Sequence, residues 1–473
     1  MREQKPKYQQ YLFRNVNWHD KCSPVSQTMR IPTIAQLQNY QPSAIEYRNI
    51  FFHRHTSPMM ATSRGGSNPM DTIIAQDLNQ LSFQERCAVY EEIHGVDSPR
   101  LEEETEQAVN TKLTALQDEI ERIAIKPAYD QAMQMSNVYV TSRKFLLMFL
   151  RAESMDPAKA ANRLVKFMER KLEYFGPESL ARAICSSDLD SDDLNNLKTG
   201  VLQVLPEKDR SGRAVIGMFL KLISSLPYRH PASMVKIMTF LYLSMIENDD
   251  EAQKKGTVMI LYFIGDGPFD WDHGFQQSGG TTIPEWLPGK FKCIHLCTPP
   301  NLANSIGHAI ANQLHPSLRV RFRVQSCESQ TECHRKLMTF GLPVHVIPVT
   351  TGMKLKTGTH LRWMAKQNTR DASILQTGNF PGIDLPGSHD ILLGRGKTLQ
   401  EHLGNQIMRS LVREWLFRYT EADRIMKTNI AWELVTRIKQ GGSRFLARSD
   451  DGWWAEVIDD LAREKVSENA EIL

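Results

Sequence analysis

The spacing of apolar residues changes near Thr199, and this change constrains the fold of the 473-residue chain more than any other feature. Before it, apolar residues recur at helical spacing, and after it short apolar segments alternate with amphipathic ones. The predicted strands are 200–206, 212–222, 257–265, 291–297 and 318–324, and the apolar segment 342–349 then crosses back. The predicted helices between them are 234–247, 301–314 and 331–341. Strands alternating with helices predict an α/β domain with a mostly parallel sheet.

Upstream, residues 141–176 predict two helices packed as a hairpin. Thr141 or Ser142 can cap the first helix, and Asp156 followed by Pro157 begins the second, which Gly176 ends. Two earlier helices are predicted. One lies at 82–95, where Ser82 and Glu85 form a capping box, and the other runs from 98–99 to Pro127. The segment EKDRSG joins the first two strands with turn residues Asp209, Ser211 and Gly212.

Two fragments, FLRAESMDPAKAANRLVKFM at 149–168 and DRSGRAV at 209–215, carry a family resemblance. Together with the order of elements, they make residues 71–350 similar to the CRAL-TRIO lipid-binding family, which is phosphatidylinositol-transfer-protein-like. The resemblance implies a helical N-terminal module at 71–185 and an α/β lipid-binding domain at 186–350. It also implies that helix 301–314 is a gate over an enclosed apolar pocket. The Gly- and Pro-rich segment 265–290 departs from the family, which places a helix there.

The predicted lipid pocket is built from two sets of apolar side chains. The strands supply Leu261, Phe263, Ile294 and Leu296, and the gate helix supplies Leu302, Ile306, Ile310 and Leu314. At about 0.8 kcal/mol per buried CH₂, an acyl chain of roughly 16 carbons gains on the order of 10 kcal/mol, in a membrane or in a protein. The pocket must therefore match a bilayer in apolar burial. The alternative is that these side chains pack on one another as a closed core.

The composition excludes several classes of protein. Seven scattered cysteines argue against a secreted disulfide framework, and the N-terminus lacks the apolar core of a signal peptide. No apolar run approaches the ~20 residues that span a bilayer, so the chain is expected to be cytoplasmic and to contact membranes only transiently. Residues 1–70 hold nine Lys and Arg against three acidic residues, without a sustained period, and are predicted to be a disordered tail.

No enzyme, metal or cofactor is predicted. The cysteines and histidines at 293–297 and 327–334 match no zinc module. The segment GRGKT at 394–398 lacks the first glycine of a phosphate loop, because Ile391 stands in its place. No catalytic constellation is present.

Residues 388–466 form a predicted α+β domain after a linker at 351–387. They resemble a small domain of unknown function marked by GRGK, GN and WW, here Gly394–Lys397, Gly404-Asn405 and Trp453-Trp454. One helix is expected at 406–418 with Ile407, Leu411, Trp415 and Leu416 facing inward. Thr420 is expected to cap a second helix, which runs to Gln440 and ends at Gly441-Gly442. A hairpin around 450–452 follows, and the residues after 449 are interpreted as an acidic tail.

The sequence therefore predicts non-enzymatic binding or transfer of a lipid or other apolar ligand, with a C-terminal domain that docks a protein partner. One alternative is a nucleic-acid-binding regulator that uses a winged-helix-like C-terminal domain. Residues 388–448 hold eleven basic against six acidic residues, and Arg395, Lys397, Arg444 and Arg448 would then contact phosphates. A ligand-free scaffold is the other alternative.

Overall fold

The computed structural model describes residues 69–96, 104–223, 226, 230–263 and 283–472. All of them belong to Ser67–Leu473, one of two compact units into which the chain divides. The predicted disordered tail therefore lies almost wholly outside the described residues, as does most of the Gly- and Pro-rich segment 265–290.

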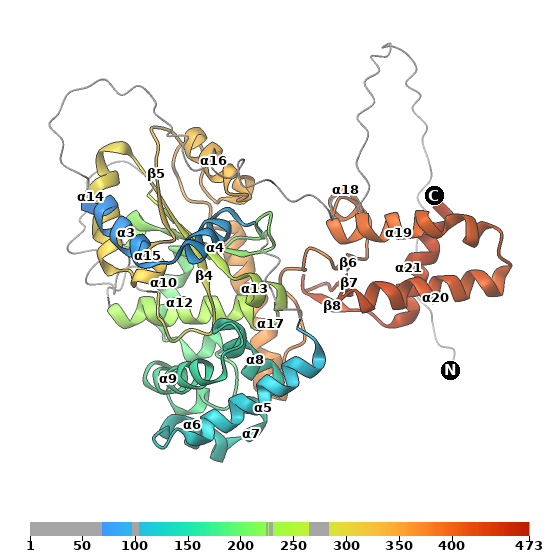
Figure 1. Ribbon diagram of the computed structural model, residues 1–473, viewed down its shortest axis with the longest axis horizontal. Helices are drawn as coiled ribbons and strands as arrows, with labels where there is room; N and C mark the ends of the chain where they lie inside the picture. The colour runs from blue at the N-terminus through green and yellow to red at the C-terminus, as the bar shows by residue number, and fades with distance from the viewer. Residues whose placement is uncertain (1–68, 97–103, 224–225, 227–229, 264–282, 473) are drawn as a thin grey trace, which may run out of the picture. The chain divides into compact units, whose positions relative to one another are not determined.

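The N-terminal part of this unit is helical (Figure 1). Its helices are α3 (Pro69–Gln80), α4 (Phe83–His94), α5 (Glu106–Arg122), α6 (Pro127–Met135), α7 (Asn137–Val140), α8 (Arg143–Ala152), α9 (Pro157–Phe175) and α10 (Ser191–Lys198). The predicted hairpin is confirmed as α8 and α9, which Ser142 and Asp156 cap and Gly176 ends. The capping box of Ser82 and Glu85 is also present.

Helix α5 begins later than its sequence indicated. Thr105 is its N-cap, and its side chain accepts a hydrogen bond from the Ala108 amide, while the expected start at 98–99 lies outside the described residues. The apolar stripe that defined the helix is nevertheless confirmed, because Val109, Leu116 and Ile120 are buried.

Five strands form the central sheet in the order β1-β2-β3-β4-β5. They are β1 (Leu202–Val204), β2 (Ala214–Phe219), β3 (Thr257–Tyr262), β4 (Phe291–Thr298) and β5 (Phe322–Ser326). β1 and β2 are antiparallel and the other neighbours are parallel, which confirms the mostly parallel α/β sheet. In the β1–β2 turn the Asp209 carboxylate accepts hydrogen bonds from the backbone amides of Ser211 and Arg213, and Gly212 has a φ of 80°.

Both faces of the sheet are covered, because successive strand residues enter different apolar clusters. Met259 and Leu261 pack in one cluster with α8, α9, α12 (Pro231–Ile246) and α14 (Pro300–Gln313). Val258 and Ile260 pack in the other with α4 and α16 (Gln330–Thr339). Burial on both sides explains why β2 and β3 are apolar nearly throughout.

Two predicted segments differ from the structure. The strand expected at 318–324 is instead α15 (Pro316–Arg319) followed by β5, which starts at Phe322. Pro316 favours the first helical position, so it begins a short helix. Segment 342–349 forms no strand of the sheet, but a 3₁₀ turn at Val344–Val346.

Residues 351–387, the expected linker, contain helix α17 (Gly358–Thr377). Six side chains of this helix are buried: His360, Trp363, Gln367, Arg370, Asp371 and Ile374. Most of them are polar, so the segment lacks the apolar stripe from which a buried helix is inferred.

The C-terminal part is a small α+β arrangement, as expected. It contains β6 (Ile391–Leu392), α18 (Lys397–Gln400), α19 (Leu403–Thr420), α20 (Arg424–Gln440), β7 (Phe445–Arg448), β8 (Trp454–Glu456) and α21 (Asp459–Ile472). The hairpin of β7 and β8 is confirmed, and β6 adds parallel to β7. Residues 388–472 are called the C-terminal domain below.

Three details of this domain were wrong. Asp423, not Thr420, caps α20. Ile407 is exposed, and α19 buries Met408, Val412 and Tyr419, while the expected Leu411 and Trp415 pack half-buried against the same core. The expected acidic tail after 449 includes helix α21, which buries Ala462, Val466 and Ala470.

Lys171 gives the helical module a pH dependence. Its side chain is fully buried in α9, its Nζ donates to the Arg182 carbonyl at 2.5 Å, and the Tyr139 ring centroid lies 4.6 Å away. Burial lowers the pKa of Lys171 to about 7, from 10.5. Between these values the unfolded chain holds a proton that the folded chain has released, so stability rises with pH there, by at most about 1.4 kcal/mol per unit. We expect urea unfolding between pH 7 and pH 10 to show a smaller increase in the free energy of unfolding for Lys171→Met than for wild type.

The matched control is Lys166→Met, an exposed position of the same helix, which should keep the wild-type slope. Equal slopes for Lys171→Met and wild type would show that Lys171 stays charged in the folded protein.

Candidate functional site

The eight predicted pocket residues lie together on one face of the sheet. Seven are buried, and the eighth, Leu302 of α14, packs on them half-buried. The i, i+4 stripe of α14 faces the strands, and this helix contacts both β4 and β5. The structure therefore assembles the predicted set in one apolar cluster, in contact with one another. A bound ligand there stays a prediction.

Methionine is frequent in this cluster. Met218 and Met259 come from the sheet, and Met234, Met238 and Met245 come from α12, all of them buried. Unbranched methionine side chains adapt to irregular space and repack at low cost. The face under α14 and α12 is therefore better suited to rearrangement than one built of β-branched residues.

Cys293 and His295 of β4 are fully buried neighbours whose Sγ and Nε2 lie 3.2 Å apart. Burial raises the pKa of Cys293 to about 12 and lowers that of His295 to about 3, so both are neutral at physiological pH. Among the described residues, no three Cys, His, Asp or Glu side chains gather as metal ligands.

In the C-terminal domain, the Gly404-Asn405 pair joins α19 to β6. A Cβ on Gly404 would lie 2.1 Å from the Asp390 carbonyl oxygen, so only glycine allows this approach. The Asn405 amide accepts from the Leu392 amide at 2.8 Å and donates to the Leu392 and Leu399 carbonyls at 2.9 and 2.8 Å. Trp453 and Trp454 are buried. The Gly-Asn pair and the two tryptophans therefore hold the fold of the domain together.

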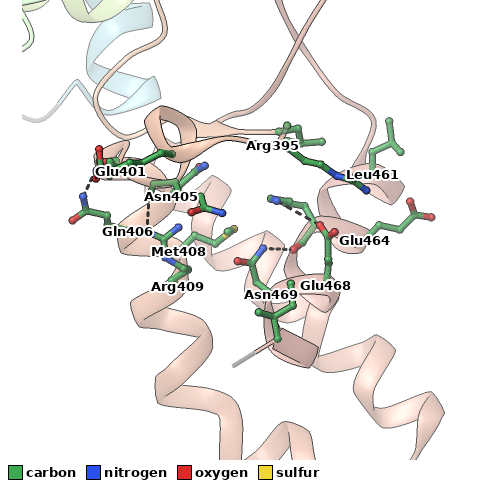
Figure 2. Close-up of a pocket in the computed structure, with 16 residues that line it drawn as sticks. Arg395, Glu401, Asn405, Gln406, Met408, Arg409, Leu461, Glu464, Glu468 and Asn469 are labelled. Atoms are coloured by element: carbon green, nitrogen blue, oxygen red, sulfur yellow. Dashed lines mark hydrogen bonds and ion pairs between the residues drawn. The ribbon is translucent and has the colours of Figure 1, made fainter. Parts of the chain in front are cut away.

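The GRGK segment has a different setting. Gly394 and Gly396 have φ angles of 137° and 127°, a backbone that other residues rarely adopt, and Arg395 and Lys397 project from it exposed. They border a groove of about 990 Å³ whose other walls are the start of α19 and helix α21 (Figure 2). No ion-pair partner of Arg395 lies within the described part of the chain, while Lys397 lies 3.7 Å from Glu401.

Charges of both signs border the groove. Arg395, Lys397 and Arg409 line it, and α21 contributes Glu464 and Glu468 (Figure 2). Arg444 and Arg448 do not reach it. Arg444 is bound to Asp390, at 2.7 Å between Nη2 and Oδ2, and Arg448 is exposed on the hairpin. The structure thus brings together two of the four predicted phosphate contacts, and the nucleic-acid interface stays a prediction.

Sequence reasoning missed a second cavity, of about 310 Å³, which α17 forms with α10 and α12. Its lining residues are Ser186, Leu194, Leu197, Lys198, Phe240, Leu361, Met364, Ala365, Gln367 and Asn368. Without recognition of α17 as a packed helix, no sequence signal pointed to it.

Comparisons with known proteins identify one part of the chain. Residues 390–470 match the family model of a domain of unknown function, DUF6824. No curated protein matches the chain. Among solved structures, a crystal structure of Sfh5 aligns over 55% of this chain and 82% of that chain, at 12% identity and a TM-score of 0.29. An alignment this loose carries no argument about ligand or activity.

None of the helices in the described ranges combines the length and apolar character that crossing a membrane requires.

Proposed function

We propose that the α/β part of this chain binds a lipid or another long apolar molecule, without catalysing a reaction, in the manner of the CRAL-TRIO family that its sequence resembles. The observation that carries the proposal is the position of the eight predicted residues. Side chains from β3, β4 and α14 that are far apart in sequence meet in one apolar cluster. In this proposal α14 is the gate that moves to admit the ligand.

Energetics set the requirement for such a gate. Burying a ligand chain of roughly 16 carbons away from water gains on the order of 10 kcal/mol of free energy, and the gain is similar in a bilayer. Exchange is feasible only if the face that receives the chain also closes on itself when empty. The methionines of β2, β3 and α12 support this part of the proposal, because they can fill the space left by the ligand.

Transfer of a labelled phospholipid between vesicles tests the proposal. We expect the full chain to accelerate transfer of a fluorescent phosphatidylcholine or phosphatidylinositol between neutral vesicles, and to co-purify with lipid detectable by mass spectrometry. Leu302→Trp adds bulk on the half-buried edge of α14 and should slow transfer about tenfold, which corresponds to about 1.4 kcal/mol.

The matched control is Leu403→Trp, at an exposed position of α19, which should transfer lipid at the wild-type rate. Protein that is repeatedly free of lipid and inactive in transfer would contradict the proposal. So would Leu302→Trp with an unchanged transfer rate.

The C-terminal domain is proposed to dock a protein partner. Nothing in its groove favours nucleic acid over protein, because Arg395, Lys397, Arg409 and Lys465 there face Glu401, Glu464 and Glu468. A phosphate backbone is bound most strongly where cations are not offset by carboxylates.

A further inference from the structure

The cavity of about 310 Å³ beneath α17 differs in chemistry from the apolar cluster under α14. Two helical segments that belong to the α/β part, α10 and α12, supply one wall, and α17 supplies the other. Its volume lies at the lower end of the range for small-molecule sites, about 300 to 1,000 Å³. It therefore suits a compact ligand, not a phospholipid.

The walls of the cavity are mostly apolar. Leu194 and Leu197 of α10, Phe240 of α12 and Met364 of α17 line it, together with Leu361 and Ala365. The remaining lining residues are Ser186, Lys198, Gln367 and Asn368, and none of the ten is acidic. An apolar chamber whose only charge is positive favours an apolar molecule with one negative group.

Gln367 is the feature of this cavity that packing does not explain. Its side chain is 1% exposed, and neither its amide nitrogen nor its amide oxygen has a hydrogen-bond partner in the described structure. Its buried neighbours on α17 each make at least one such contact: His360 Nε2 with the Leu197 carbonyl at 2.7 Å, although His360 Nδ1 has no partner in the described structure, and Arg370 with Glu247 at 2.6 Å. A buried amide that makes no hydrogen bond destabilises a protein, so a ligand group that pairs with it would explain its presence.

Lys198 and Asn368 complete the site at its solvent side. Both are exposed and both line the cavity. No ion-pair partner of Lys198 is found among the residues that the structure describes, although α10 and its surroundings are rich in Asp. Its ammonium group is thus available to a carboxylate, and the Asn368 amide can donate a second hydrogen bond to it.

We infer that this cavity binds a short aliphatic acid that carries a hydroxyl group. The carboxylate would contact Lys198 and Asn368, and the aliphatic chain would lie among Leu194, Leu197 and Phe240. The hydroxyl would accept a hydrogen bond from Gln367 Nε2 and donate one to its Oε1. None of the eight residues proposed to contact the lipid lines this cavity, so the inference does not rest on the proposed function.

Titration calorimetry of the full chain with 3-hydroxyoctanoate and octanoate tests the inference. We expect saturable binding of 3-hydroxyoctanoate, at least tenfold tighter than octanoate, because only the first pairs with Gln367. Lys198→Gln should weaken both acids about tenfold. Leu302→Trp, which addresses the lipid proposal, should leave both affinities unchanged.

Gln367→Met separates a ligand-binding role from a structural one. It replaces an unpaired amide with an apolar side chain of similar size, so it should raise the Tm of the ligand-free chain by about 2 to 4 °C. It should also abolish the preference for the hydroxy acid. Gln376→Met, at an exposed position of the same helix, should change neither quantity.

Two results would overturn the inference. One is the absence of saturable binding of either acid up to about 1 mM. The other is a Gln367→Met variant that loses stability and keeps the wild-type preference, since the amide would then have a structural partner.

Discussion

Replacing Arg370 with methionine should lower the free energy of unfolding by about 3 to 5 kcal/mol, because it leaves two buried carboxylates without their cation. The Arg370 side chain is 1% exposed. Its Nη2 donates to Glu247 at 2.6 Å, and its Nη1 donates to Asp371 at 3.0 Å and to the Ile184 carbonyl at 3.1 Å. The arginine thereby joins α17 to the end of α12 and to the segment that precedes α10.

The remaining acceptors of this network are only partly satisfied. Asp371 also accepts from the backbone amide and the hydroxyl of Ser186, at 2.7 and 2.5 Å. Glu247 has a second carboxylate oxygen that is buried without a partner in the described residues. Among the described residues, Arg370 is the only cation that forms an ion pair with Glu247.

The experiment is thermal and urea unfolding of the full chain carrying Arg370→Met. Arg362→Met is the matched control, because Arg362 is exposed on the same helix, and it should change stability by less than about 0.5 kcal/mol. Adding Glu247→Gln to Arg370→Met should recover part of the loss, since it removes one uncompensated charge. If Arg370→Met unfolds like the Arg362 control, α17 is not held by this ion pair.

Helix α17 also shows where the sequence misled us. Its buried face carries His360, Gln367, Arg370 and Asp371, and polar residues at helical spacing indicate a solvated helix or a linker. Their burial depends on partners more than 100 positions away, such as Glu247 for Arg370. The local sequence does not show which distant residues will pair with these side chains. Neither the packed helix nor the cavity that it forms could therefore be predicted.

Helix α19 illustrates a second kind of failure. Ile407, Leu411 and Trp415 make one apolar stripe, and Met408, Val412 and Tyr419 make another, rotated by one residue. The structure buries the second stripe, exposes Ile407 and packs Leu411 and Trp415 half-buried against the same core. Either choice satisfies a helical period, and the close approach at Gly404, which fixes the rotation, is a tertiary contact.

Predictions based on strong local signals were confirmed. The hairpin of α8 and α9 was specified by Ser142, Asp156, Pro157 and Gly176, residues whose effect on helix ends is local. The buried parallel strands were recognised because both of their faces are apolar. Assembly of the pocket residues on one face followed from these two facts and the spacing within α14.

Gly404→Ala should destabilise the C-terminal domain by about 3 kcal/mol or more, because the new Cβ would meet rigid backbone. The nearest atoms would be the carbonyl oxygens of Asp390 and His389, at 2.1 and 2.6 Å. Neither can move as a flexible side chain does, so α19 would have to shift away from β6. That shift would also pull Asn405 from its three hydrogen bonds to Leu392 and Leu399.

Hydrogen–deuterium exchange of the full chain locates the effect, since a chain of several parts need not unfold in one step. Protection should fall in β6, β7 and α19 and stay unchanged in β3 and β4. Asn405→Ala should give a weaker loss in the same segments, because it removes the hydrogen bonds without a clash. Gly358→Ala is the control, since an added Cβ there meets nothing within 4 Å. Unchanged protection in β6 for Gly404→Ala would refute the close approach of α19, and with it the structural explanation of the Gly-Asn pair.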